Sequence, residues 1–360
     1  MTAADDWRAA RRYLDGHRHA LGAAAVRRYP GLARIPGTTA LTRTAWLPSA
    51  PIPLDDVRLA WDDAPEPPAV TGEGPEAAGV RAGYPTYAAA LAALAPPRLL
   101  EDRYTYRLTG LPGLPGPLTY GPGSYFAGLN TGEAMAHELA AAVLAGRDPV
   151  TAALPLRDAV GDPTDPGRRP MTTAISVLTL RHDPRDGTAA FPLHRRDASG
   201  VAHAGGLDQV LPVGVFQPSG TTAATRRADL DLWRCAVREY AEELLGAPED
   251  YPEPFDYDRW PPYRALTDAR ADGRLRAYLL GVATDPLTAA TDLLAVTVIE
   301  AGTFDRVFPA LTRSTLEGTL TGPVPFTPES VREIVTSTPI QPAGAAVLTL
   351  ADRHRRRIGG

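Results

Sequence analysis

Three glutamates close together in the chain are the residues best suited to carry chemistry. Glu239, Glu242 and Glu243 stand at positions i, i+3 and i+4, so in a helix their carboxylates would project from one face. No Lys or Arg stands four residues after any of them to balance the charge. Closely spaced carboxylate oxygens are the ligands that a hard divalent cation needs. The spacing therefore predicts a site for Mg2+ (or Mn2+), and the alternative is an ordinary acidic helix face.

The segment that must position these glutamates runs from Asp229 to Gly246. Its apolar residues recur at steps of three and four, which predicts an amphipathic helix with one buried stripe. A glycine directly after the last periodic residue is typical of a helix C-cap. The stripe consists of Leu230, Trp233, Val237, Tyr240, Ala241 and Leu244.

The order of residues 238–246 (REYAEELLG) resembles the second half of the Nudix box. In that family Arg-Glu, an apolar residue and Glu-Glu follow one another, and here the apolar place and the glycine are shifted by one. The resemblance implies that Glu239, Glu242 and Glu243 bind the metal that activates water against a diphosphate. It also implies that Arg238 orients one of these glutamates through an ion pair.

The first half of the box matches less closely. The family has a Gly-rich loop and a further Glu about eight residues before the Arg. The loop candidate here is residues 212–218 (PVGVFQP), and the position that the spacing gives to the Glu holds Leu230. Gln217 and Asp231 are the candidates to replace it.

Two functions are compatible with this degenerate box. One is a metal-dependent hydrolase of a nucleoside diphosphate derivative or a related diphosphate-linked small molecule. The other is a catalytically inactive Nudix-like protein that binds a ligand or acts in regulation. Because an acidic residue late in the fold often completes the site or serves as base in this family, the resemblance also implies a role for Glu300 or Asp285.

The elements around the glutamate helix follow the order of the Nudix fold. The resemblance therefore implies an α/β chain with a Nudix-like α/β/α sandwich and a mixed sheet over residues 172–358. The same region resembles the C-terminal halves of actinobacterial regulators in which PxGxFQP precedes DLWR…REYxEELLG. We predict strands over residues 173–180, 189–196, 209–216, 274–282 and 293–299, and helices over 328–335 and 343–355.

Residues 1–160 are expected to form an N-terminal α+β accessory domain whose role the sequence does not reveal. A stretch dense in Pro, Gly and Asp over residues 158–170 predicts the domain boundary. The run Gly121-Pro122-Gly123 predicts a structural turn, because no GK[ST] motif follows it. Helical patterns cover residues 7–29, 86–94 and 131–145, and strand patterns cover 57–61 and the later part of 98–108.

Composition excludes several function classes. All 37 Lys+Arg residues are Arg, so neither Schiff-base chemistry nor a Walker lysine is available. Cys235 is the only cysteine, which excludes an internal disulfide and a Cys-rich zinc site. With a net charge of -5 and no long basic tract, nucleic acid is not an expected partner.

The expected partner is a small-molecule nucleotide or diphosphate substrate, and a homodimer is left open. The chain has no apolar run of membrane-spanning length and begins without an apolar leader segment. These features predict a cytoplasmic protein without a membrane partner.

Overall fold

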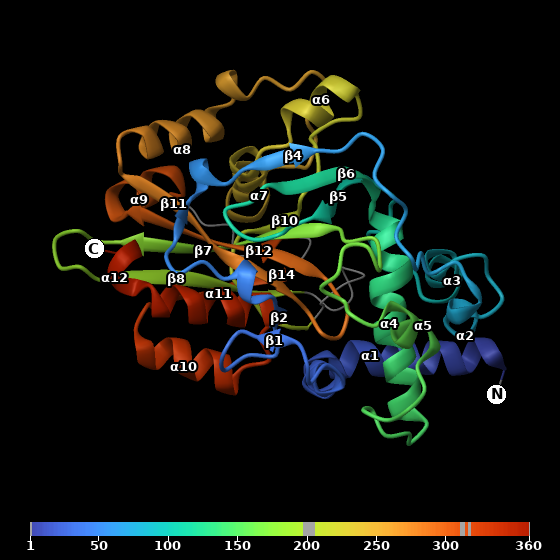
Figure 1. Ribbon diagram of the computed structural model, residues 1–360. Helices are drawn as coiled ribbons and strands as arrows, with labels where there is room; N and C mark the ends of the chain where they lie inside the picture. The colour runs from blue at the N-terminus through green and yellow to red at the C-terminus, as the bar shows by residue number, and fades with distance from the viewer. Residues whose placement is uncertain (1, 197–205, 310–313, 316–317, 360) are drawn as a thin grey trace.

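The computed structural model describes residues 2–196, 206–309, 314–315 and 318–359. The chain belongs to the mixed α/β class, as expected, and a curled mixed sheet forms its centre (Figure 1). None of the helices in the described part combines the length and the apolar character that a membrane crossing requires.

The central sheet is antiparallel except where β12 and β7 run parallel in register. In spatial order its main strands are β1 (Ala33–Arg34), β2 (Leu41–Thr42), β11 (Leu275–Thr284), β12 (Thr291–Glu300), β7 (Thr173–His182), β8 (Ala189–Arg196), β14 (Gly318–Pro325) and β13 (Ser314–Thr315). Three short strands pair beside this path: β3 (Ile52–Pro53) with β11, β9 (Asp208–Gln209) with β8, and β10 (Val213–Val215) with β7. The run 209–216 therefore forms parts of two short strands, and Pro212, which has no N–H to donate, lies between them.

Alternation along the strands builds one apolar core on each face of the sheet. Ile175 and Val177 of β7 belong to the core under α7 (Leu232–Leu245), whereas Leu178 and Leu180 belong to the core on the other face. The first face also carries α8 (Pro261–Ala271) and α9 (Ala301–Val307), and the second carries α10 (Pro328–Ser337), α11 (Pro342–Arg353) and α12 (Arg355–Ile358). Helices thus cover both faces of the sheet (Figure 1).

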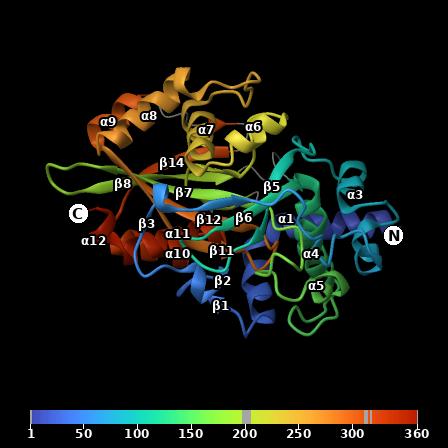
Figure 2. The same ribbon diagram turned by 45° about the horizontal axis from the view of Figure 1, so that its top comes forward.

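The N-terminal helices gather at one end of the sheet in both views (Figures 1 and 2). They are α1 (Ala3–Ala25), α2 (Ala78–Arg81), α3 (Tyr87–Leu94), α4 (Tyr125–Leu144) and α5 (Pro155–Val160), while the short α6 (Ala223–Ala228) precedes α7. The same part of the chain forms a second sheet in the order β4 (Leu59–Trp61), β6 (Leu118–Ser124), β5 (Tyr104–Gly110). Tyr106 and Tyr120 of this sheet are fully buried in the core that α7 also enters.

Gly121-Pro122-Gly123 is not the turn that its composition predicts, because it lies inside β6. Strand β4 pairs only with residues 118–120, so the missing N–H of Pro122 leaves no partner there unsatisfied. A Cβ on Gly123 would lie 3.0 Å from the Cβ of Arg107 on β5. The glycine therefore lets the two strands approach closely.

The boundary expected near residues 158–170 does not separate two sheets. Strands β1, β2 and β3 come from the first sixty residues, yet they extend the central sheet beside β11. Arg157 is buried and donates hydrogen bonds to the carbonyl oxygens of Pro286 and Leu287 in the turn before β12. Residues 2–160 are thus built into the body that carries the glutamate helix.

Candidate functional site

Helix α7 is fixed on the sheet by its apolar stripe and by one buried hydroxyl. The Asp231 side chain caps its first turn. Gly246 ends the helix with a φ of 68°, as the sequence predicts. The Tyr240 hydroxyl lies 2.7 Å from the Thr179 hydroxyl on β7 and 2.5 Å from the Thr297 hydroxyl on β12. These contacts set the rotation of the helix and hence the direction of its glutamates.

The three glutamates do not lie on a solvated helix face. Glu239 and Glu243 are 8% and 7% exposed, and Glu242 is half-buried. The Glu239 carboxyl group packs directly on Gly214 of β10, where an added Cβ would lie 1.8 Å from its Cδ. Glu243 accepts a hydrogen bond of 3.1 Å from the Val213 backbone N–H. The glutamates therefore face the loop and strand that precede α7.

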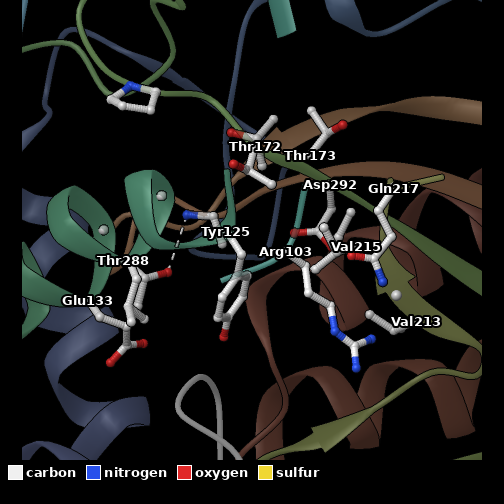
Figure 3. A pocket seen from close by; sticks show the side chains of 18 of the residues that line it. Arg103, Tyr125, Glu133, Thr172, Thr173, Val213, Val215, Gln217, Thr288 and Asp292 are labelled. Carbon is white, nitrogen blue, oxygen red and sulfur yellow. Dashed lines mark hydrogen bonds between the residues drawn. The ribbon is translucent and has the colours of Figure 1, made fainter. Parts of the chain in front are cut away.

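A cavity of about 340 Å³ is lined by Glu239 and Glu242. Figure 3 shows it from close by, with Arg103, Gln217 and Asp292 among the labelled side chains. Its walls are the first half of α4, the first residues of β7 and β12, strand β10 and helix α7. Strand β7 pairs with β10 along its first residues and with β8 only at its end, so the sheet opens at this place. The polar side chains that matter below are Glu239, Glu242, Glu249, Asp292, Arg103 and Gln217.

Glu239 is a buried carboxyl group of this cavity, and the charge of the neighbouring Arg238 offsets the cost of its burial only in part. Within the described ranges no side chain or backbone N–H donates a hydrogen bond to it. Burial, followed by the charges of Glu242 and Glu243, raises the pKa of Glu239 well above its ordinary value. A cation bound in the cavity would reverse this shift by favouring the ionised form.

The other acids of the cavity have partners in the protein. Tyr251 donates a hydrogen bond of 2.5 Å to Glu242, and Ser176 donates one of 2.8 Å to Asp292. Glu249 is held by Gln217 at 3.0 Å and by an ion pair with Arg103. Carboxylate oxygens of this kind fit a hard divalent cation. Among the described residues, however, no three His, Cys, Asp or Glu side chains converge as a metal ion would require.

Arg238 does not orient a glutamate of the helix, which corrects the expectation from the sequence. Its guanidinium pairs at 3.5 Å with Asp229 and donates to the Tyr257 hydroxyl and to the Gln217 carbonyl. The side chain turns toward the start of the helix because the buried Asp229 carboxylate offers a counter-charge there. Asp229 also accepts a hydrogen bond of 2.6 Å from the Ser219 N–H. Arg238 and Asp229 together therefore hold the loop that precedes the helix.

Asp229 is the buried partner of Arg238, and the sequence did not single it out. It stands nine residues before Arg238, next to Leu230, where the family spacing would place a Glu. Gln217 and Asp231, the two candidates to replace the family's Glu, have other contacts. Gln217 bonds to Glu249, and Asp231 caps the helix. The sequence therefore does carry an acidic residue near the position expected for the Glu, but one residue earlier in the chain.

Glu300 and Asp285 are not brought to the cavity. The cavity lies at the first residues of β12, whereas Glu300 is the last residue of that strand, roughly 30 Å away at about 3.3 Å per residue. Asp285 accepts hydrogen bonds from the Leu287 N–H and the Thr288 hydroxyl in its own turn. The acid that β12 contributes to the cavity is Asp292.

A scan against models of known protein families found no match, and a search of curated proteins found none either. The resemblance to the Nudix family therefore rests on the sequence pattern alone. The function has to be argued from the cavity and its side chains.

Proposed function

We propose that this cavity is the site of a metal-dependent hydrolase that acts on a nucleoside diphosphate derivative or a related diphosphate-linked small molecule. The observation that carries the proposal is Glu239, a buried carboxyl group that packs on Gly214 at the cavity wall and for which the described residues supply no hydrogen-bond donor. Such a group is costly to ionise unless a cation arrives with the ligand. The volume of about 340 Å³ lies within the range of small-molecule sites.

The residues that would hold Mg2+ or Mn2+ are Glu239 and Glu242, with Glu249 as the third acid of the same wall. Glu243 is less suited than its place in the motif suggests, because the Val213 N–H already binds it. A bound divalent ion would supply a water of lowered pKa and would polarise a phosphoryl oxygen. The protein itself contributes these acids and the Arg103 guanidinium, which pairs with Glu249.

A second candidate function is ligand binding without turnover. It is favoured by the hydrogen bonds that already engage Glu242 and Glu243, and by the lack of three converging acids among the described residues. In that case the cavity would hold a nucleotide or small metabolite as part of a sensor or scaffold.

A screen of nucleoside diphosphate derivatives with Mg2+ or Mn2+, scored for phosphate release, separates the two functions. We expect metal-dependent release by the parent protein and its loss in Glu239→Gln, which keeps the shape of the side chain but not its charge. Glu300→Gln is the matched control, because it removes the same charge from the far end of β12. Saturable nucleotide binding without release from any substrate would favour the second function.

A further inference from the structure

Arg103 is the cavity arginine whose guanidinium can receive a ligand. The side chain is 42% exposed and points into the cavity beside Tyr125 (Figure 3). Arg169 also lines the cavity, but its nitrogens bond to the Pro163 and Pro170 carbonyls and to the Thr291 hydroxyl. The Arg103 Nε donates a hydrogen bond of 2.9 Å to Glu101, and its Nη1 pairs with Glu249. In the part of the chain that the structure describes, no hydrogen bond engages its Nη2, which is the nitrogen left for a ligand.

Two donors converge on a single carboxylate oxygen at this place. Arg103 and Gln217 both contact the Oε1 of Glu249, the latter at 3.0 Å. The donors come from distant parts of the chain, and the Gln217 backbone is held in turn by Arg238. Glu249 reaches them from the segment after α7, where its side chain is 37% exposed. A charged and a neutral donor that meet at one anionic oxygen are also the arrangement that binds a phosphate oxygen.

We propose that Arg103 and Gln217 form the receptor for a phosphate or diphosphate group of the ligand, and that Glu249 occupies this receptor until the ligand displaces it. The inference rests on the proposed function in so far as it takes the cavity to be the ligand site. It assigns anion recognition to Arg103 together with Gln217, and it releases Glu249 from its ion pair when the anion is bound.

The two partners of one ion pair should then have opposite effects on anion binding. The probe is inorganic pyrophosphate, titrated calorimetrically into the full chain with EDTA present, so that neither metal nor turnover contributes. Glu249→Ala removes the competitor and should tighten binding by about two- to fivefold, the factor that an exposed ion pair contributes. Arg103→Gln removes the receptor and should weaken binding about tenfold or more.

Three further variants make the result specific. Glu242→Ala removes an equal charge from the same cavity without freeing Arg103, so it should tighten binding less than Glu249→Ala. Arg98→Gln removes an exposed arginine of the same segment that does not line the cavity, and should leave binding unchanged. Arg103→Lys keeps the charge without the planar fork and should fall between the parent and Arg103→Gln.

The proposal is overturned if Glu249→Ala and Arg103→Gln both weaken pyrophosphate binding, since the ion pair would then only be structural. It is equally overturned if Glu242→Ala tightens binding as much as Glu249→Ala, because general charge would explain the effect. Because no turnover is measured, opposite effects of the two partners would support the receptor even if no hydrolysis is ever detected.

Discussion

Gly214→Ala should separate the stability of this protein from its function. Strand β10 can accept alanine, because the φ of Gly214 lies outside the range that excludes L side chains. The new Cβ would lie 1.8 Å from the Cδ of Glu239 and 2.0 Å and 2.1 Å from its oxygens. To reach an ordinary carbon contact of about 3.5 Å, the carboxyl group would have to retreat by about 1.7 Å.

The free-energy cost of this retreat is small, since the obstructing atoms end a flexible side chain. A strained rotamer costs about 0.5–1.5 kcal/mol, so the Tm should fall by only a few degrees. The functional cost is larger, because a misplacement of about 1 Å in a site can reduce turnover about 100-fold. We therefore expect metal-dependent turnover, or cation affinity if there is no turnover, to fall by about that factor.

A double-mutant cycle with Glu239→Ala tests this reasoning, with thermal unfolding and cation titration as the two readouts. In the Glu239→Ala background the obstructing carboxyl group is gone, so Gly214→Ala should change neither quantity further. Gly110→Ala serves as the control within another strand, where the added Cβ meets Thr119 at an ordinary 3.7 Å. An equal loss of stability from Gly214→Ala in both backgrounds would show that Glu239 is not what the new methyl group meets.

Three other predictions concern single residues. Because the raised pKa of Glu239 keeps an extra proton on the folded state, the free energy of unfolding should fall as pH rises above about 4.5 toward that pKa, by at most about 1.4 kcal/mol per pH unit. Denaturant titrations at several pH values should show that Glu239→Gln removes this pH dependence, and an unchanged dependence would contradict the raised pKa. Asp229→Ala should lower the free energy of unfolding by about 3–5 kcal/mol, since it leaves the Arg238 guanidinium buried without its counter-charge. Urea unfolding measures this loss, and a loss below about 1 kcal/mol would count against a stabilising ion pair. Gly132→Ala should lower the free energy of unfolding by about 1–3 kcal/mol, because the added Cβ would lie 2.3 Å from the Thr288 carbonyl oxygen, which cannot move without the backbone. Thermal unfolding measures this, and a Tm equal to that of the parent would show that α4 can shift freely.

Local patterns predicted the elements of the fold well where periodicity and caps agree. The strand over residues 189–196 and the ending of α7 at Gly246 are found as predicted, and β7, β11 and β12 differ only at their ends. Helix α4 begins at Tyr125, whereas the sequence predicts residue 131. The glycines in and just before its first turns are typical of loops and so do not indicate a helix. Its cap, Ser124, is fixed by a 2.6 Å hydrogen bond to Asp102, which no local pattern announces.

The site could be predicted only in part, because most of its contacts join distant parts of the chain. The glutamates of α7 were found from their spacing, which is a local property. Arg103 and Asp292 reach the same cavity through the packing of α4 and the parallel register of β12 and β7, and neither has a motif of its own. Glu300 was expected there from the family resemblance, but the direction of β12 carries it to the other end of the sheet.

The pairing of β2 and β3 with β11 sets the order in which the chain can fold during its synthesis. The Thr42 hydroxyl donates to the carbonyl of Val282, a partner 240 residues further along the chain. At about 5–20 residues per second, the ribosome needs on the order of ten seconds or more to supply that partner. We expect residues 33–53 to wait through this interval with unpaired strand edges, which are the surfaces that chaperones and other nascent chains recognise.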